Sequence, residues 1–331
     1  MCAGPAFAIG KAETGSSRAR RHASISGSSG TQLAFRLQCI DPIRVSVRRG
    51  GVTEAIHRVH AVAVQDGAVI AEAGDAALVT FMRSSSKPLQ AVPLARARAD
   101  LDERDLAIAS ASHLADDAQL AAVRALLAKA PASDDELECG PQGEPPTRLK
   151  HNCSGKHAGM LALCRAKGWR SEGYRLEGHR VQREMLAVHA EASEVPEDEI
   201  RTGIDGCGVL TFALPLERMA HAFARLPQLE GGDRIVAGMK AYPDLIRGPR
   251  AADTRLMKTL SVWIAKGGAE GLLCASGNGI GVALKVEDGN GRAVGPAAAA
   301  FFRQLDLDLS DLAVVPLENS RGELVGEITS E

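Results

Sequence analysis

The chain has 331 residues, of which 45% are hydrophobic and 24% are charged, as in ordinary soluble proteins. These proportions exclude a collagen-like, a wholly disordered or a membrane-spanning chain. The 39 Lys and Arg nearly balance the 41 Asp and Glu, and there are only two Trp, two Tyr and seven Phe. Because nucleic-acid binding uses a basic surface or aromatic rings that stack on bases, we do not expect a nucleic-acid partner.

The seven cysteines are scattered along the chain, and an odd, dispersed set is not the framework of a small disulfide-rich secreted protein. No run of 18 apolar residues occurs, and the start of the sequence lacks the apolar core of a secretory signal. We therefore expect reduced thiols, no membrane contact and a cytoplasmic location.

Residues 1–40 differ in composition from the rest of the chain. They hold six Ser, five Gly and five basic residues against one acid, Glu13. We expect a disordered N-terminal tail, with an Arg-rich transit peptide as the alternative. The remaining residues, 41–331, are expected to form one domain.

The N-terminal part of this domain has the pattern of antiparallel strands, because apolar and polar residues alternate and Gly separates the segments. The predicted strands are residues 43–47, 59–64, 69–73 and 78–82. The middle of the chain instead has helical periodicity. The predicted helices there are residues 88–99, 116–129, 156–167, 177–191, 216–224, 233–240 and 253–266.

The C-terminal part returns to strands. The predicted strands are residues 271–275, 279–287 and 312–317, with a helix at 296–305. Strands at both ends of the domain with helices between them predict an α+β fold. We expect an antiparallel sheet flanked by helices, completed by N- and C-terminal segments and carrying a helical insertion.

The segment Ser84-Ser85-Ser86-Lys87 lies where a predicted strand passes into a helix. The spacing of Ser84 and Lys87 places a hydroxyl and an amine on one face of a helix. A buried lysine with a lowered pKa accepts the hydroxyl proton and activates the serine for acyl transfer. The alternative is that serine only caps the helix.

The segment 151–157, HNCSGKH, concentrates groups with donor or ligand atoms around one glycine at the start of a predicted helix. A helix N-terminus favours a thiolate or an anionic substrate. Three interpretations stay open: Cys153 is a nucleophile, it is one ligand of a metal, or it is a bystander in a helix cap.

Cys207 lies between two glycines in the segment 205–208, DGCG, where the backbone can turn sharply. A second thiol beside Cys153 would suit zinc, whose other ligands are nitrogen, oxygen or water. The spacing is not that of a zinc finger, so such a site needs the fold to bring the two cysteines together.

Three weaker candidates lie elsewhere. Ser112 ends an Ala/Ser-rich segment, Lys285 lies among apolar residues of a predicted strand, and Lys266 precedes two glycines at the end of a predicted helix. Each also has an ordinary interpretation, namely a packed small residue, a solvent-facing lysine and a basic helix C-terminus.

Seven segments occur in the order in which a known family has them: RGGVTEAIHR, RSSSKPLQA, ASH, HNCSGKHAGML, DGCGVLTFALPL, AKGGAEGL and GIGVALKVEDG. Through these segments the sequence resembles the L-asparaginase II family, the class 3 or Rhizobium-type asparaginases. The resemblance implies a fold similar to those of serine β-lactamases, penicillin-binding proteins and glutaminases.

The resemblance also implies catalytic residues. It places one Ser–Lys pair at Ser84 and Lys87 and a second pair at Ser112 and Lys285. Lys266 is the less favoured partner in the second pair, because the related folds place that lysine on a strand that lines the site.

A zinc site is implied by the same resemblance, with Cys153, Lys156 and Cys207 as ligands and water completing the shell. A lysine binds zinc only as the neutral amine, which burial beside the cation makes reasonable. Asp205 is expected as a partner of Lys156 or of the zinc-bound water.

The implied activity is hydrolysis of L-asparagine to L-aspartate and ammonia, by a homodimer. The alternatives are another Ser–Lys acyl hydrolase, such as a glutaminase or a β-lactamase-like enzyme, and a zinc- or amide-binding homologue without turnover. Two departures from the family pattern bear on the substrate loops. Residues 248–254 read GPRAADT where Gly-Thr-Gly-Arg-x-Asp-Thr is usual, and Leu114-Ala115 follows ASH in place of Gly-Glu.

Overall fold

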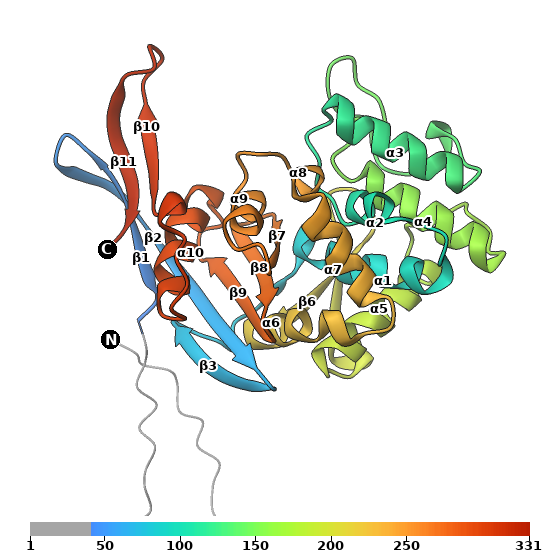
Figure 1. The fold of residues 1–331 in the computed structure, drawn as a ribbon, viewed down its shortest axis with the longest axis horizontal. Coiled ribbons are helices and arrows are strands. Elements are labelled where there is room, and N and C mark those ends of the chain that lie inside the picture. Colours follow the sequence, from blue (N-terminus) through green and yellow to red (C-terminus); the bar gives the residue numbers. More distant parts are fainter. Residues whose placement is uncertain (1–40) are drawn as a thin grey trace, which may run out of the picture. The chain divides into compact units, whose positions relative to one another are not determined.

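The computed structural model describes residues 41–331, and the tail expected at residues 1–40 lies outside the described residues. The described part consists of two antiparallel sheets with helices packed on them (Figure 1). Within residues 41–331, no helix is both long enough and apolar enough to cross a membrane.

The larger sheet has the strand order β10-β11-β1-β2-β9-β8-β7, with β3 paired to β2, and the smaller sheet has the order β4-β6-β5. Every pairing is antiparallel. The strands are β1 (Ile43–Arg49), β2 (Val52–Gln65), β3 (Ala68–Ala73), β4 (Val79–Phe81), β5 (Arg201–Ile204), β6 (Leu210–Pro215), β7 (Ile264–Gly268), β8 (Leu272–Gly277), β9 (Ile280–Val286), β10 (Val314–Glu318) and β11 (Leu324–Ser330).

The α-helices are α1 (Lys87–Ala97), α2 (Glu103–Ala109), α3 (Asp117–Lys129), α4 (Ser154–Lys167), α5 (Arg180–Ser193), α6 (Leu216–Arg225), α7 (Gly232–Ala241), α8 (Pro243–Ile246), α9 (Ala252–Thr259) and α10 (Val294–Arg303). The short 3₁₀ helices are η1 (Arg83–Ser86), η2 (Asp134–Glu136), η3 (Glu197–Glu199), η4 (Leu226–Gln228), η5 (Gly291–Ala293) and η6 (Ser310–Leu312). The predicted α+β fold is confirmed.

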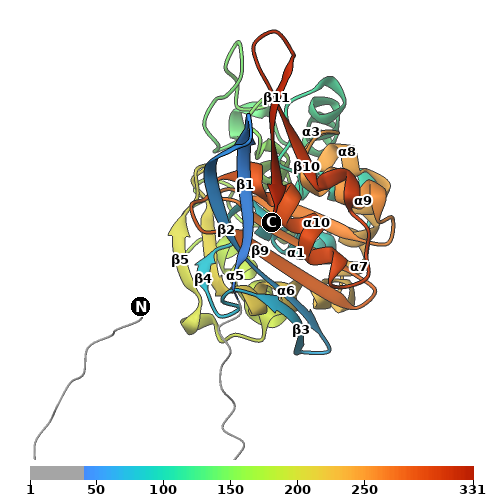
Figure 2. The same ribbon diagram turned by 90° about the vertical axis from the view of Figure 1, so that its left-hand side faces the viewer.

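The two ends of the domain meet in the larger sheet, as predicted. β1 pairs with β11, which pairs with β10, and Figure 2 shows these strands side by side. β11 itself was not predicted, because Gly326 interrupts its apolar pattern. In the structure this glycine allows a close approach of two strands, since a Cβ there would lie 2.2 Å from the carbonyl oxygen of Arg48.

Helices cover both faces of the larger sheet. Gly281 of β9 lies against α6, where a side chain would collide with the helix backbone. Gly277 of β8 is paired with the residue before Gly281 and so faces the other way, against Trp263. Trp263 in turn packs on Phe302 of α10 at a ring distance of 5.0 Å. The sheet is therefore the middle layer between α6 and α10, and its core is built mainly from Ala, Leu, Val and Ile.

Helices α1 to α5 form the predicted insertion, which lies between β4 and β5 in the chain. It begins with η1, which continues directly into α1, and Pro88 occupies the first turn of α1, where its missing N–H costs nothing. The amide of Met82 donates to the carbonyl of Phe212 in the smaller sheet (2.8 Å), and Ser85 Oγ donates to the carbonyl of Lys266 in the larger sheet (2.9 Å). The start of the insertion is thus bonded to both sheets.

One predicted helix is wrong over half its length. The sequence predicts a helix over residues 253–266, but α9 ends at Thr259 and β7 begins at Ile264. β7 pairs along its whole length with β8, which places Lys266 opposite Cys274. Strand pairing and the burial of Trp263 therefore override the helical periodicity of this segment.

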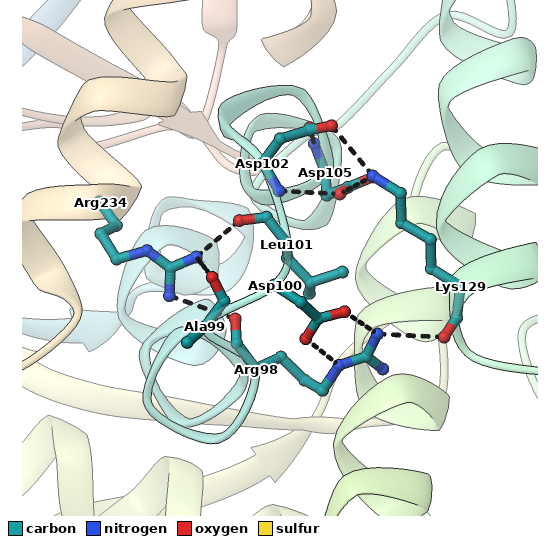
Figure 3. A network of polar contacts seen from close by, with 8 residues as sticks. All are labelled: Arg98, Ala99, Asp100, Leu101, Asp102, Asp105, Lys129 and Arg234. Atoms are coloured by element: carbon teal, nitrogen blue, oxygen red, sulfur yellow. Dashed lines mark hydrogen bonds and ion pairs between the residues drawn. The ribbon is translucent and has the colours of Figure 1, made fainter.

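A polar network joins the end of α1 to α2, α3 and α7 (Figure 3). Arg234 of α7 donates to the carbonyl of Leu101 at 2.6 Å and to other carbonyls in and after the last turn of α1. Lys129, at the end of α3, donates to Asp105 (2.5 Å) and Asp102 (2.9 Å). These bonds satisfy polar groups at helix ends that have no partner inside their helices.

Candidate active site

A cavity of about 350 Å³ opens where η1, the loop before α4 and the turn before β6 meet. Its lining includes four residues that the sequence analysis singled out, Ser84, Cys153, Asp205 and Cys207, together with Arg83. Segments that lie far apart in the chain thus place their candidate groups around one space.

Ser84 is the one of the three consecutive serines that lines the cavity. Ser85 donates to the carbonyl of Lys266 (2.9 Å) and Ser86 donates to the carbonyl of Arg83 (2.7 Å), and both side chains are fully buried. The backbone therefore occupies two of the three hydroxyls. The half-buried hydroxyl of Ser84 is the one that faces the cavity.

Arg83 holds the turn that presents Ser84. Its φ of +49° lies in the left-handed region, which costs a residue with a side chain about 1–2 kcal/mol. The amide of Arg83 donates to Thr211 Oγ1 at 3.0 Å, and its Nε donates to Asp205 Oδ1 at 2.7 Å. These bonds offset the strain of the left-handed backbone at Arg83. Nothing in the sequence predicts this conformation.

Lys87 lies one helical turn beyond Ser84, and its side chain is fully buried. Its Nζ donates to the carbonyl of Ala111 (2.5 Å) and to Ser112 Oγ (2.9 Å). Burial lowers the pKa of Lys87, although the nearby Cys153 sulfur opposes this. The structure therefore brings Lys87 to Ser112, and no hydrogen bond joins the described side chains of Ser84 and Lys87.

His113 connects the Ser112 loop to the start of α4. Its Nε2 lies 2.8 Å from Ser154 Oγ, and the Ser154 hydroxyl donates to the carbonyl of Leu149 at 2.7 Å. The serine oxygen must therefore accept from Nε2–H, which leaves Nδ1 to accept from the amide of Ala115 (3.1 Å). Burial lowers the pKa of His113 to about 3, so this neutral tautomer is the form present near neutral pH.

Cys153, Lys156 and Cys207 come together beside the cavity, although the two cysteines are far apart in the sequence. All three are nearly fully buried, and Lys156 Nζ lies 3.1 Å from Cys207 Sγ. A hydrogen bond with Cys153 and the charge of Lys156 lower the pKa of Cys207 to about 5, although burial opposes them. Burial lowers the pKa of Lys156, but the interactions with the sulfurs of Cys207 and Cys153 outweigh burial, so the pKa of Lys156 is raised. The three groups form an ammonium–thiolate cluster.

Asp205 lies next to this cluster and is held by Arg83. Its Oδ1 accepts from Arg83 Nε and from the amide of Gly206 at 2.8 Å. Burial opposes ionisation of Asp205, but the charges of Lys156 and Arg83 outweigh it, so the pKa of Asp205 is lowered. The carboxylate is therefore ionised and faces the cavity from the side of the cluster.

Lys285 does not meet Ser112. It lies on β9, and its Nζ donates to the carbonyl of Val286. Burial lowers the pKa of Lys285, and the charges around it are carboxylates, with Glu270 the strongest. The hydroxyl of Ser112 is instead bonded to Lys87. The expected Ser112–Lys285 pair is therefore not formed in the structure.

Lys266 is the second lysine that the fold brings to the site. It is fully buried on β7, and the charge of Lys87 is close enough to affect it. Burial lowers the pKa of Lys266 to about 7, although the carboxylate of Asp253 opposes this. The sequence disfavoured Lys266 relative to Lys285 because it placed residue 266 on a helix. The structure instead places Lys266 on strand β7, bonded through its carbonyl to Ser85 of η1.

The sequence matches the family model for L-asparaginase II over residues 45–330, nearly all of the described part. The chain belongs to the L-asparaginase II family. This membership supports an asparaginase-type amidohydrolase, an enzyme that hydrolyses an amide. The resemblance inferred from the seven segments is thus confirmed.

Two solved structures resemble the L-asparaginase II chain only distantly. A structure of Mglu in its native form has a TM-score of 0.42 and 15% identity, and the match covers 80% of this chain and 69% of that one. A structure of Mglu in 4.3 M NaCl has a TM-score of 0.42 and 14% identity, with 80% and 66% covered. No match was found among curated proteins.

The cluster beside the cavity has donors that suit the zinc ion implied by resemblance to the L-asparaginase II family. Zinc binds cysteine sulfur and nitrogen ligands, and Cys153, Lys156 and Cys207 would supply two sulfurs and, once the Lys156 ammonium gives up a proton, one nitrogen. Within residues 41–331, no three His, Cys, Asp or Glu side chains gather as a metal site. A metal here would therefore need Lys156 as its third protein ligand.

The two departures from the L-asparaginase II pattern lie next to each other. The side chain of Leu114 is 67% exposed, and a Cβ on Gly248 would lie 2.9 Å from it. Gly248 has a φ of +130°, which a residue with a side chain rarely adopts. The two segments that carry the departures thus meet at Gly248 and Leu114, and neither contains a residue that lines the cavity.

Proposed function

We propose that the protein hydrolyses L-asparagine to L-aspartate and ammonia. The observation that carries the proposal is the cavity lined by Ser84, with the buried amine of Lys87 one helical turn away, in a chain of the L-asparaginase II family. A volume of about 350 Å³ suits a small substrate. The ionised groups of Arg83 and Asp205 at its wall suit a substrate that carries both charges.

Ser84 is the nucleophile in this proposal. Its Oγ forms a bond to the side-chain amide carbon of asparagine, and its proton passes to the neutral amine of Lys87. The burial that lowers the pKa of Lys87 favours that neutral form. The C–N bond then breaks as the proton is given to the departing nitrogen, which leaves as ammonia. Water attacks the resulting ester, Ser84 recovers a proton, and aspartate is released.

Ser112 and Lys266 serve the proton transfers. Ser112 accepts a hydrogen bond from Lys87 at 2.9 Å, which holds the amine and offers a path for its proton. Lys266 takes the role that the resemblance gave to Lys285, because its buried amine lies on a strand that Ser85 bonds to η1, the segment that presents Ser84. In this proposal, Lys266 gives the proton that the leaving nitrogen receives.

Cys153, Lys156 and Cys207 would hold the zinc ion. Bound there, zinc would supply a Lewis acid that helps to hold the substrate, since the Ser–Lys pair already provides the nucleophile. Asp205 would support this site from beside Lys156. A homodimer stays a prediction from the resemblance, and a cytoplasmic location stays a prediction from the sequence.

The test is ammonia release from L-asparagine by the purified chain and by Ser84→Ala. We expect the variant to lose on the order of 10³-fold or more in kcat while its melting temperature is unchanged. Ser86→Ala is the matched control, because it removes a hydroxyl two residues away that is bonded to the backbone and does not line the cavity. It should keep activity within about tenfold.

Activity of Ser84→Ala near that of the unaltered protein would contradict the Ser-nucleophile mechanism. A panel of L-asparagine, L-glutamine and a chromogenic β-lactam separates the asparaginase from the two rival acyl hydrolases. Zinc in the purified protein, without ammonia release from either amino acid amide and without hydrolysis of the β-lactam, would favour a binding protein instead.

A further inference from the structure

A buried carboxylate next to Lys266 is used by none of the steps above. Asp253 lies in the first turn of α9 and is 2% exposed. Its Oδ1 accepts from the amide of Thr254 (3.0 Å), and its Oδ2 accepts from the amide of Gly267 (2.8 Å). One side chain thus ties α9 to β7 at the residue directly after Lys266.

The glycine at position 267 makes this approach possible. A Cβ there would lie 3.1 Å from Asp253 Oδ2, tighter than ordinary contact. On the neighbouring residue of β7, the carbonyl of Lys266 accepts from Ser85 Oγ of η1 at 2.9 Å. The Lys266–Gly267 peptide is therefore bonded through its N–H to α9 and through its carbonyl to η1, the segment that presents Ser84.

Asp253 also places a negative charge beside the amine. Its Oδ2 lies 3.8 Å from Lys266 Nζ, and both side chains are nearly without exposure to water. Nζ itself donates to the carbonyl of Gly267 at 2.7 Å, so the carboxylate acts on the amine through its charge. The other charged or titratable groups that face Lys266 are Lys87, Arg247, Cys153 and Cys274.

We propose that Asp253 is a positioning residue that fixes Lys266 in the site through its bond to β7 and keeps the amine able to hold a proton through its charge. The inference rests on the proposed function, in which Lys266 gives a proton to the leaving nitrogen. Burial and the positive charges of Lys87 and Arg247 lower the pKa of Lys266, and Asp253 is the strongest group that raises it. The balance, a pKa of about 7, keeps both forms of the amine present near neutral pH.

The experiment compares the full-length protein with Asp253→Asn, which keeps the shape of the side chain and an oxygen for the amide of Gly267. Lysine labelled with ¹³C at Cε reports the titration of Lys266 by NMR, and Lys266→Met identifies its signal. We expect the apparent pKa of Lys266 to fall by about one unit or more in Asp253→Asn. We also expect kcat at pH 7 to fall about tenfold or more while KM changes less than about threefold, because Asp253 does not line the cavity.

Asp244→Asn is the matched control, because Asp244 lies near the same helix and pairs with the half-exposed Lys258 at 2.7 Å. It should leave the Lys266 signal and the kcat unchanged. An unchanged Lys266 titration in a folded Asp253→Asn variant would overturn the inference. If the unaltered protein releases no ammonia, the proposed function fails, and the NMR titration alone still decides whether Asp253 controls Lys266.

Discussion

Two regions of the molecule use lysine in opposite ways. In the network at the end of α1, Lys129 reaches two carboxylates, Asp105 and Asp102, and its side chain is 37% exposed (Figure 3). The bond to Asp105 raises the pKa of Lys129. In the candidate site, Lys87 is fully buried, its Nζ donates to a hydroxyl and two carbonyls, and burial lowers its pKa. One region stabilises the charge of its lysine and the other weakens it.

The difference shows what each region contributes. A lysine paired with carboxylates and partly in water helps to hold α2 and α3 together, but it has no free electron pair to accept a proton. A lysine without a carboxylate in a buried site costs folding free energy, and this same cost makes its neutral form accessible. Conflicts between stability and chemistry are expected at functional sites.

The largest expected effect comes from Lys87→Met, which we predict to lower kcat for L-asparagine by 10³-fold or more. Stability should respond in the opposite sense. The pKa of Lys87 is below its ordinary 10.5 in the folded state, so the buried amine costs stability at pH values below 10.5, and the cost shrinks as the pH rises toward that value. Urea unfolding at pH 7 should therefore show no loss of stability in this variant.

Lys129→Met is the matched control for that experiment. It makes the same change of side chain but leaves the buried carboxylate of Asp105 without its cation, so we expect a loss of about 1–3 kcal/mol in stability. The kcat should stay within about twofold, because Lys129 does not line the cavity. If both variants lost stability equally and kept kcat, the contrast between the two regions would be wrong.

A smaller effect is expected from the cysteines beside the cavity, which are candidate zinc ligands, whereas the network at the end of α1 contains no cysteine. Cys207→Ser should weaken zinc binding by more than the roughly 10- to 100-fold that loss of an outer-shell partner costs. Chelator competition measures this without any reference to activity. Cys164→Ala is the control, because Cys164 is also buried but lies away from the cavity. Equal zinc affinity in the two variants would exclude Cys207 as a ligand.

Much of the fold could be predicted from the sequence, because local patterns agreed with tertiary packing. Residues 116–129 have a capping box, in which Asp116 and Gln119 bond each other's backbone amides, and α3 begins there as expected. The antiparallel opening was marked by alternation and by Gly67. β7 could not be predicted, because the helical periodicity of residues 253–266 is local whereas its pairing with β8 is not.

The candidate site also has residues that the sequence indicates and contacts that only the fold creates. Ser84 and Lys87 were visible as a spacing, and Cys153 stood out as part of a dense segment. That Cys153 meets Cys207 is a product of the fold, since nothing in their separation indicates it. Asp253 could not be singled out either, because it is bonded to Gly267 of β7, and the sequence predicts a helix up to residue 266 instead of this strand.

The smallest expected effect tests the exposed edge of the network. Arg98 donates from Nε and Nη2 to the two oxygens of Asp100, each at 2.7 Å, and this bond lowers the pKa of Asp100 from 3.8 to about 2. Because the folded-state pKa is the lower one, the pair stabilises the protein above pH 3.8 and the contribution is lost as the pH falls toward 2.

Asp100→Asn should therefore be slightly less stable than the unaltered protein at pH 7 and equal to it near pH 2. The Asp100 side chain is 63% exposed, so water and salt screen the pair, and the difference at pH 7 should shrink further in 1 M NaCl. Urea midpoints at the two pH values and two salt concentrations measure this. A difference that persisted at pH 2 would mean that the Asp100 side chain contributes by packing and not by charge. Within the network of Figure 3, the contrast with Lys87 would then depend on Lys129 and its buried partner Asp105.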